Sequence, residues 1–400
     1  MAKIVSIVLV LACGALFALA EDPRQVETPR TTPFANQSPK PEPKAKPDQE
    51  PKPPVDPGQG NTTRKKEKRG DWVFAPIPIR SPTVGSGLIL GAGYIFKFKK
   101  DDTKSPPSTI AGGGAFTSNG SRGFALAGSL KFAQNKYQAT PAFGRGRIRY
   151  DFFGIGRLPG EKDRSVEIEQ DGRVFFAEFL VNLGKNVFVG PRYQNRKLTA
   201  AIRREPTEGG FEVPAIDLDS TTAGIGFKIK QDTRDSSFYP RKGHLWEFKA
   251  DFFRDGLGSK RDYNKFGAAY NGFYSIGQKQ VLAYRGSACS VGDDAPFYDV
   301  CFFGGSDLRG YAMGRFQDRR MFAAQAEFRQ ELPWRIGLVG FAGFGGVAKR
   351  WDEFSFDELL PAAGLGLRFK IEKTNHINYS IDFGFGRDGH TISISVLEAF

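Results

Sequence analysis

The sequence predicts an all-β protein, a transmembrane antiparallel β-barrel. Three observations lead to this prediction. The 400 residues include 48 glycines and 37 phenylalanines but only three histidines, which is typical of barrels with aromatic lipid-facing positions and a crowded lumen. Long segments alternate apolar and polar residues with a period of two. No apolar run after residue 20 is long enough for a membrane-spanning helix, so a membrane would have to be crossed by strands.

Residues 1–20 have the features of a secretory signal peptide. Lys3 supplies the positive charge, residues 4–17 form the apolar core, and Ala18-Leu19-Ala20 is a small-x-small cleavage site. A lipoprotein signal stays an alternative, because residues 10–14 loosely fit a lipobox around Cys13. The apolar core continues beyond Cys13, which favours cleavage after Ala20.

The composition of residues 21–70 predicts a disordered, Pro/Lys-rich periplasmic linker. Eleven prolines lie between Pro23 and Pro57, and such a segment cannot bury enough apolar area to fold. The net charge of the chain is +13. An exported basic protein meets outer-membrane lipids and lipopolysaccharide rather than nucleic acid. The basic run at residues 64–69 is most simply a solvated tether.

The outer-membrane β-barrel is expected over residues 71–400, where apolar and polar residues alternate. About fifteen alternating segments can be counted, and sixteen strands are expected because both ends should lie on the periplasmic side. Trp72 to Ile79 or a missed strand would supply the sixteenth. The last strand is expected at Thr391 to Phe400, with Ile392, Ile394, Val396 and Phe400 on one face. Glycines 85, 87, 91 and 93 fit either a weakly paired first strand or a crowded lumen.

A glycine-flanked loop, Gly304 to Tyr311, presents a single arginine, Arg309. Removal of the signal peptide leaves two cysteines, Cys289 and Cys301, just before this loop. An even pair in an oxidising compartment favours a disulfide at the base of the loop, with two unpaired thiols as the alternative.

Several motifs resemble the bacterial surface antigen family of outer-membrane barrels, of BamA/TamA type. The similarity covers essentially all of 71–400, and the most specific match is Leu308-Arg309-Gly310-Tyr311. The other matching segments are Pro76 to Gly87, Tyr150 to Gly156, Asp232 to Asp235 and Tyr239 to Gly243. The terminal Phe400 is similar to the signal by which the barrel-assembly machinery recognises such proteins for insertion.

The resemblance implies that the arginine loop is extracellular in origin and folds back into the lumen. There Arg309, with Gly310 and Tyr311, would be held by Glu327 on the barrel wall, since a guanidinium can bind carboxylates bidentately. Two family positions differ. A Phe-x-Asp motif reads Phe341-Ala342-Gly343, and an Arg-x-Asp motif reads Ser380-Ile381-Asp382. Glu327 is therefore expected to hold the loop alone or with Asp382.

The resemblance also implies a role in assembly or translocation of outer-membrane proteins or lipids, with client proteins as partners. Such members carry periplasmic POTRA domains, and residues 21–70 have no room for one. A passive anion-preferring pore, or a structural barrel that is monomeric or dimeric, is the alternative. An enzyme is not expected, because His244, His376 and His390 lie far apart with no convincing catalytic spacing. No cofactor and no metal cluster are expected.

Overall fold

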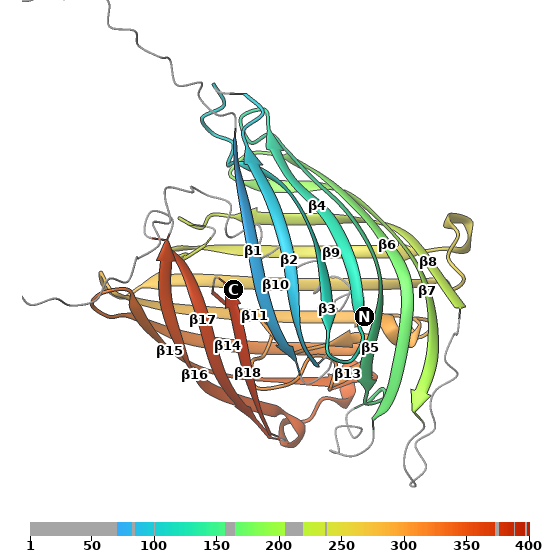
Figure 1. Cartoon of the computed structure of the whole chain (residues 1–400). Coiled ribbons are helices and arrows are strands. Elements are labelled where there is room, and N and C mark those ends of the chain that lie inside the picture. Colours follow the sequence, from blue (N-terminus) through green and yellow to red (C-terminus); the bar gives the residue numbers. More distant parts are fainter. Residues whose placement is uncertain are drawn as a thin grey trace, which may run out of the picture.

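The computed structural model is dominated by one large antiparallel sheet that curves into a barrel (Figure 1). The structure describes residues 70–81, 85–99, 101–156, 165–204, 219–236, 238–372, 376–387, 389–396 and 398–400. The predicted signal peptide and all of the predicted linker except Gly70 lie outside the described residues. Among the residues that are described, no helix is long and apolar enough to cross a membrane.

Sixteen strands form the sheet in the order β1 to β11 and β14 to β18, and β12 and β13 form a separate pair. The strands are β1 (Gly70–Ser81), β2 (Gly85–Phe96), β3 (Ser108–Thr117), β4 (Arg122–Phe132), β5 (Tyr137–Phe152), β6 (Val166–Asn182), β7 (Val187–Arg204), β8 (Asp219–Asp232), β9 (Gly243–Phe253), β10 (Tyr263–Ser275), β11 (Gln280–Val291), β12 (Cys301–Phe302), β13 (Gln317–Asp318), β14 (Arg320–Glu331), β15 (Ile336–Ala348), β16 (Leu360–Glu372), β17 (Ile377–Gly386) and β18 (Gly389–Val396). The predicted all-β antiparallel fold is confirmed.

Alternation along the strands separates an outer apolar face from an inner polar face. In β16 Leu365, Leu367 and Phe369 are exposed on the outside, whereas Arg368 between them is 4% exposed and points inward. Successive side chains of a strand point to opposite faces, so the same backbone supplies a lipid-facing belt and a polar lumen.

The lengths of the connections assign the two ends of the barrel. Four-residue turns join β4 to β5, β6 to β7, β10 to β11 and β14 to β15. The connections at the other end include the longest ones, at residues 153–165, 205–218 and 292–319. Outer-membrane barrels have short periplasmic turns and longer extracellular loops, so the long connections mark the extracellular end.

The glycine-rich segment is the second strand, which corrects the expectation that it could be a weakly paired first strand. The first strand is β1, which contains the Trp72 to Ile79 segment. β2 pairs with β1 along its whole length and with β3 on its other side. A Cβ at Gly87 would lie 2.3 Å from the Phe116 carbonyl oxygen. Glycine here permits close approach of neighbouring strands.

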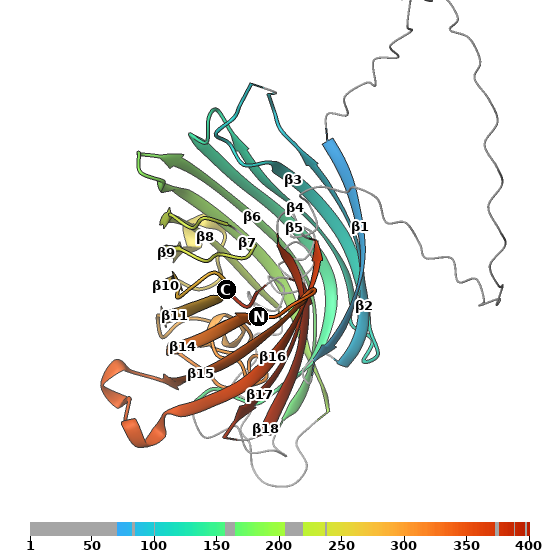
Figure 2. The same cartoon turned by 90° about the vertical axis from the view of Figure 1, so that its left-hand side faces the viewer.

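The first and last strands, β1 and β18, come close to each other over only part of their length (Figures 1 and 2). Within the described residues no ladder of hydrogen bonds joins them, since β1 pairs with β2 and β18 with β17. We call this junction the seam.

The C-terminus differs from the predicted strand Thr391 to Phe400. β18 ends at Val396, and Phe400 does not share the outer face of Ile392 and Ile394, which are exposed. Instead the Phe400 carbonyl accepts a hydrogen bond from the buried Arg329. The reason is electrostatic. Glu398 pairs with a guanidinium inside the barrel, and this contact holds the last residues away from the lipid face.

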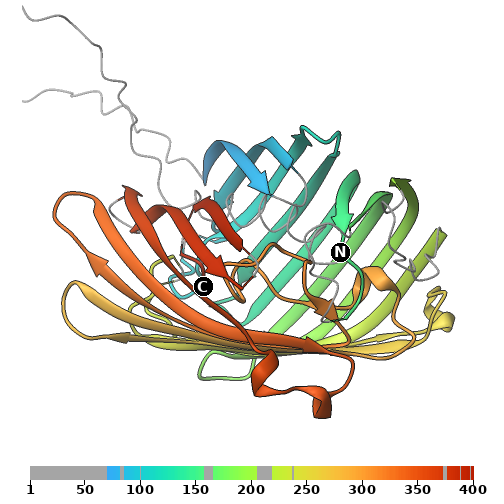
Figure 3. The ribbon, with the colours of Figure 1, turned by 90° about the horizontal axis from the view of Figure 1, so that it is seen from below.

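The connection at residues 292–319, between β11 and β14, lies on the concave, inner side of the curved sheet (Figure 3). Phe303, Leu308, Tyr311 and Phe316 from this connection form an apolar cluster with wall residues that include Met321. This connection therefore occupies part of the lumen, as expected for a loop inserted from the extracellular side.

Candidate functional site

Arg309 reaches deep into the lumen because its neighbours allow the backbone to lie against the wall. Gly310 has φ of +110°, and a Cβ there would lie 2.8 Å from the Phe385 carbonyl oxygen of β17. A side chain would be strained in this conformation and would also collide with the wall. Tyr311 then donates from its hydroxyl to the Pro361 carbonyl at 2.6 Å. These contacts aim Arg309 toward the periplasmic half of the barrel.

The Arg309 guanidinium is held on several sides. Its Nη2 donates to Glu327 of β14, and its Nη1 donates to Asp382 of β17 at 3.0 Å. Gln325 accepts from both the backbone N–H and Nε of Arg309, at 3.3 and 3.2 Å. The guanidinium carbon lies 3.8 Å from the centre of the Phe341 ring, a cation–π contact. The structure thus brings Arg309 together with both Glu327 and Asp382.

These contacts belong to a closed circuit of alternating charges, which we call the ion-pair ring. Each member contacts two members of opposite sign. In order around the circuit the members are Arg309, Glu327, Arg329, Glu398, Arg368 and Asp382, back to Arg309. The contact between Arg329 and Glu398 is the longest, at 3.9 Å. Three arginines and three carboxylates make the ring formally neutral.

The ring connects parts of the chain that are far apart in sequence. Arg309 comes from the extracellular connection, Arg329 from β14, Arg368 from β16 and Glu398 from the segment after β18. The side chains of all six members are 7% exposed or less. A buried charge that loses its partner is strongly destabilising, so the arginine loop and the C-terminal segment are energetically coupled through the ring.

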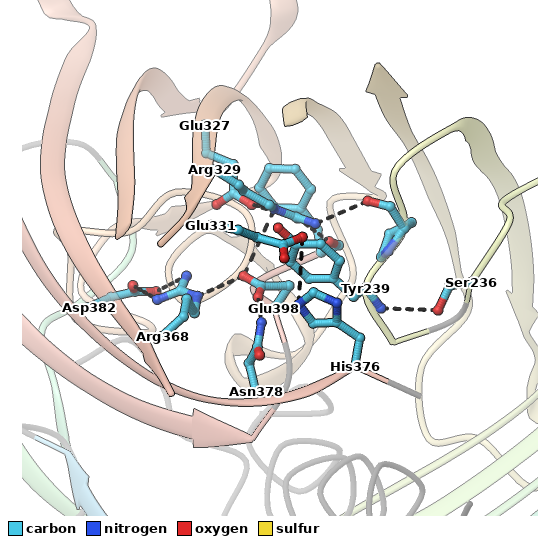
Figure 4. Close-up of polar contacts among 12 residues, drawn as sticks. Ser236, Tyr239, Glu327, Arg329, Glu331, Arg368, His376, Asn378, Asp382 and Glu398 are labelled. Carbon is cyan, nitrogen blue, oxygen red and sulfur yellow. Dashed lines mark hydrogen bonds and ion pairs between the residues drawn. The ribbon is translucent and has the colours of Figure 1, made fainter. Parts of the chain in front are cut away.

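Polar contacts at the periplasmic mouth extend the ring (Figure 4). Glu398 accepts from Asn378 of β17 at 2.7 Å as well as from Arg368. Arg329 donates to the Pro240 carbonyl of the β8–β9 connection at 3.3 Å. In the same region the rings of Tyr239 and His376 stack in parallel with centroids 3.8 Å apart. The C-terminal segment is thereby enclosed by periplasmic turns.

At the two positions where the sequence differs from the family motifs, side chains on neighbouring strands supply the polar contacts. Arg368 of β16 lies directly opposite Ser380 in the β16–β17 register, and it supplies the guanidinium for Asp382 at 2.6 Å. Gly343 lies opposite Gln325, and a Cβ at Gly343 would lie 2.4 Å from the Ala324 carbonyl oxygen. The wall is too close for an aspartate there, and Gln325 accepts from Arg309 instead.

The base of the connection is held by covalent and ionic contacts. Cys289 of β11 and Cys301 of β12 are joined by a disulfide, with Cα atoms 5.7 Å apart. Nearer the arginine, Asp307 accepts from Arg285 Nη2 of β11 at 2.8 Å. Both contacts restrain the connection against β11, one at each end of its inward path.

Besides Asp307, the buried carboxylate of Asp299 anchors the extracellular part of the same connection. This residue was not identified from the sequence. It accepts from Lys265 at 2.6 Å and from the Tyr263 hydroxyl at 2.7 Å. Its Oδ1 also lies 3.0 Å from Nη1 of Arg196. Burial by itself would raise the pKa of Asp299, but Arg196 and Lys265 outweigh burial and hold it below its usual value. Nothing in the local sequence distinguishes Asp299 from an exposed loop aspartate.

The ring residues are positioned for restraint rather than for covalent chemistry, since each charge is neutralised by its neighbours. Of the predicted loop residues, Arg309, Gly310, Tyr311, Glu327 and Asp382 meet in one place. Their functional role stays a prediction. Arg329 and Arg368 stand on strands whose alternation already placed them in the lumen, whereas no periodic signal indicated that Glu398 faces inward.

The chain is similar to known outer-membrane barrels in both sequence and fold. The Omp85 superfamily domain matches residues 181–384. No curated protein matches the sequence. BamA from Haemophilus ducreyi lacking POTRA domains 1–3 is similar in structure, with a TM-score of 0.51, 15% identity and coverage of 82% of this chain and 69% of that chain.

Two CdiB structures are similar to the same extent. The protein from Acinetobacter baumannii has a TM-score of 0.54 at 11% identity, and the protein from Escherichia coli has 0.54 at 12% identity. Each comparison covers 82% of this chain but only 60% and 62%, respectively, of the CdiB chains. At these identities the structures establish a shared barrel fold. Together with the domain match over half of the sequence, they show that the chain is an outer-membrane β-barrel that belongs to the Omp85 superfamily.

Proposed function

We propose that the barrel assists the assembly or translocation of outer-membrane proteins, and that the seam between β1 and β18 is where it acts. The observation that supports this proposal is the unpaired edge of β1. β1 has twelve residues and β18 has eight, and no ladder joins them within the described residues. A free strand edge can template an incoming strand through main-chain hydrogen bonds.

The sequence of β1 is consistent with an edge strand. Pro76 and Pro78 lie within it, and proline is confined to edge strands, strand starts and bulges because it has no N–H to donate. Trp72 and Phe74 on the same strand are 61% and 74% exposed. The edge of β1 therefore lacks an N–H donor at two positions, and its outer face is apolar.

The path of the C-terminal segment also supports an incompletely paired seam. Since the chain turns inward after Val396 and Glu398 joins the ion-pair ring, the last residues do not extend β18 along β1. The ring thus stabilises an arrangement in which β18 is shorter than β1.

A crosslinking experiment tests the role of the seam. Single cysteines would be introduced along β1 and β18, and a pair that forms a disulfide across the seam would be selected. A strain that lacks the gene, complemented with this variant, is expected to show the same fall in other outer-membrane proteins as the deletion itself. Reduction with dithiothreitol, which also opens the Cys289–Cys301 disulfide, should restore their levels to those of the wild type treated in the same way.

The matched control is a cysteine pair at Leu90 and Gly114, which face each other in the β2–β3 ladder. This crosslink leaves the seam free and should permit full complementation. Complementation by the seam-locked variant at the level of the control would contradict a role of the seam in assembly.

An anion-preferring pore is the second candidate, and the inner face of β6–β9 is the observation that favours it. The charged side chains that face one another there include Arg192, Lys228, Lys230 and Lys249 against Glu178, Glu247 and Asp251. A lumen with an excess of cations favours anions. Planar-bilayer recordings test this candidate: steady anion-selective conductance supports it, and absence of conductance removes it.

A further inference from the structure

The outer surface of β4–β7 changes from apolar to cationic partway along the strands, which are neighbours in Figure 1. On the apolar part Phe124, Leu126, Phe175 and Phe179 are each at least 40% exposed. These residues form the lipid-facing belt of this sector.

One row of the ladder at the edge of the belt is basic. The register places Phe124 opposite Arg145, Arg145 opposite Arg173, and Arg173 opposite Lys197. We call Arg145, Arg173 and Lys197 the basic row. All three are exposed, whereas the alternate residues Arg196 and Leu198 are buried inside the barrel. The basic row therefore faces outward, on the same side as the belt.

The height of the row can be estimated from the aromatic residues at the periplasmic end. Tyr137, at the start of β5, packs with Phe132 and Phe179. Arg145 lies eight residues further along the strand, about 27 Å at the usual rise per residue. A strand tilt of about 40° reduces this to about 21 Å, close to the roughly 25 Å apolar band of outer-membrane barrels. The basic row thus stands at the outer-leaflet boundary.

The cations of the row have no anion among the described residues to neutralise them. Like charges directly opposite each other on adjacent strands are destabilising. The nearest acidic side chains are already engaged: Glu169 pairs with Arg149 and Arg203, and Asp171 pairs with Arg147. A row of like charges beside an apolar belt is stabilised by a ligand that is both anionic and apolar.

We propose that the basic row of Arg145, Arg173 and Lys197 binds the phosphate groups of lipid A in the outer leaflet, with the acyl chains lying on the adjacent belt. Arg122 stands one row further toward the extracellular end, opposite Arg147, and extends the site for a second phosphate. Guanidinium groups suit phosphate oxygens because they donate bidentately. A free phosphate would satisfy the charges but would not cover Phe124 and its neighbours.

Binding of defined lipids to the purified barrel in neutral detergent tests the proposal, for example by native mass spectrometry. The variant combines Arg145→Gln, Arg173→Gln and Lys197→Gln. The wild type is expected to retain bisphosphorylated lipid A, and the variant should bind it about tenfold or more weakly, since each basic residue at a membrane surface contributes substantially to anionic lipid binding. Dephosphorylated lipid A should bind both proteins weakly.

The matched control removes three exposed lysines from periplasmic turns, with Lys99→Gln, Lys185→Gln and Lys279→Gln, and should bind lipid A like the wild type. Heat-modifiable migration on gels verifies folding, and the single variant Arg173→Gln should give an intermediate affinity. Equal binding by the wild type and the basic-row variant would overturn the proposal. Displacement of lipid A by inorganic phosphate at similar concentrations would show a free-anion site instead and would overturn the lipid assignment.

Discussion

Arg368 of β16 and Glu398 of the C-terminal segment face each other inside the barrel, with 2.7 Å between Nε and Oε2. Through Asp382 the same arginine is linked to Arg309 of the extracellular connection. One buried guanidinium therefore stands between the loop that enters from outside and the tail that ends the chain.

Replacing Glu398 by glutamine should release the C-terminal segment. Arg368 and Arg329 would lose one carboxylate in a buried environment, and loss of one partner of a buried ion pair costs about 3–5 kcal/mol. We expect a lower temperature for loss of heat-modifiable migration and faster carboxypeptidase trimming of the last residues. Asp294→Asn, which removes an exposed loop carboxylate, serves as the control and should change neither. Unchanged trimming of the Glu398 variant would show that the tail is held by other contacts.

Arg309→Ala and Glu327→Ala should both lower the temperature at which the folded barrel is lost on gels. Each leaves a buried charge without its closest partner, with a cost of about 3–5 kcal/mol. The double variant should lose less than the sum of the two, because contacting residues are not additive. Unchanged migration in both single variants would remove the pair as the restraint of the loop.

Removal of the disulfide between Cys289 and Cys301 should destabilise the base of the connection. The two residues are separated by 12 positions, and closing a loop of this size is worth about 3 kcal/mol in the chain-entropy account. We expect the Cys289→Ser, Cys301→Ser variant to melt at a lower temperature. Dithiothreitol should lower the melting temperature of the wild type toward that of the variant and leave the variant unaffected.

Stability should fall between pH 6.5 and about 4 through His376. Burial and, to a smaller extent, Lys370 lower the pKa of His376 to about 4, and Glu331 opposes these effects only in part. Because the folded protein binds the proton less readily than the unfolded chain, this contribution is present above pH 6.5 and is lost as the pH decreases toward the folded pKa. Asn is the suitable replacement, because His376 has φ of +57° and asparagine tolerates this conformation.

The measurement for His376 is the melting temperature of the wild type and the His376→Asn variant from pH 7.5 to 4. The variant should show a shallower decrease over this range. Parallel curves for the two proteins would assign the acid sensitivity to other groups.

Much of the barrel could be predicted from local patterns. Alternation with a period of two is a property of neighbouring residues, so it identified strands such as β16 and assigned Leu365 and Arg368 to opposite faces. The arginine loop was recognisable for a similar reason, since glycines flank Arg309 within eight residues. Parity of the strand count gave sixteen because the two ends of a barrel constrain each other.

The remaining features depend on contacts between distant segments. The alternation predicts that Arg368 and Asp382 face the lumen. Only the register between β16 and β17 shows that Arg368 lies opposite Ser380 and supplies the arginine that position 380 lacks. The pattern extended the last strand to Phe400, whereas the tertiary structure turns the chain inward after Val396. The reason is electrostatic: Glu398 is an ordinary acidic residue in sequence, and it becomes a buried partner only where Arg329 and Arg368, from two other strands, converge.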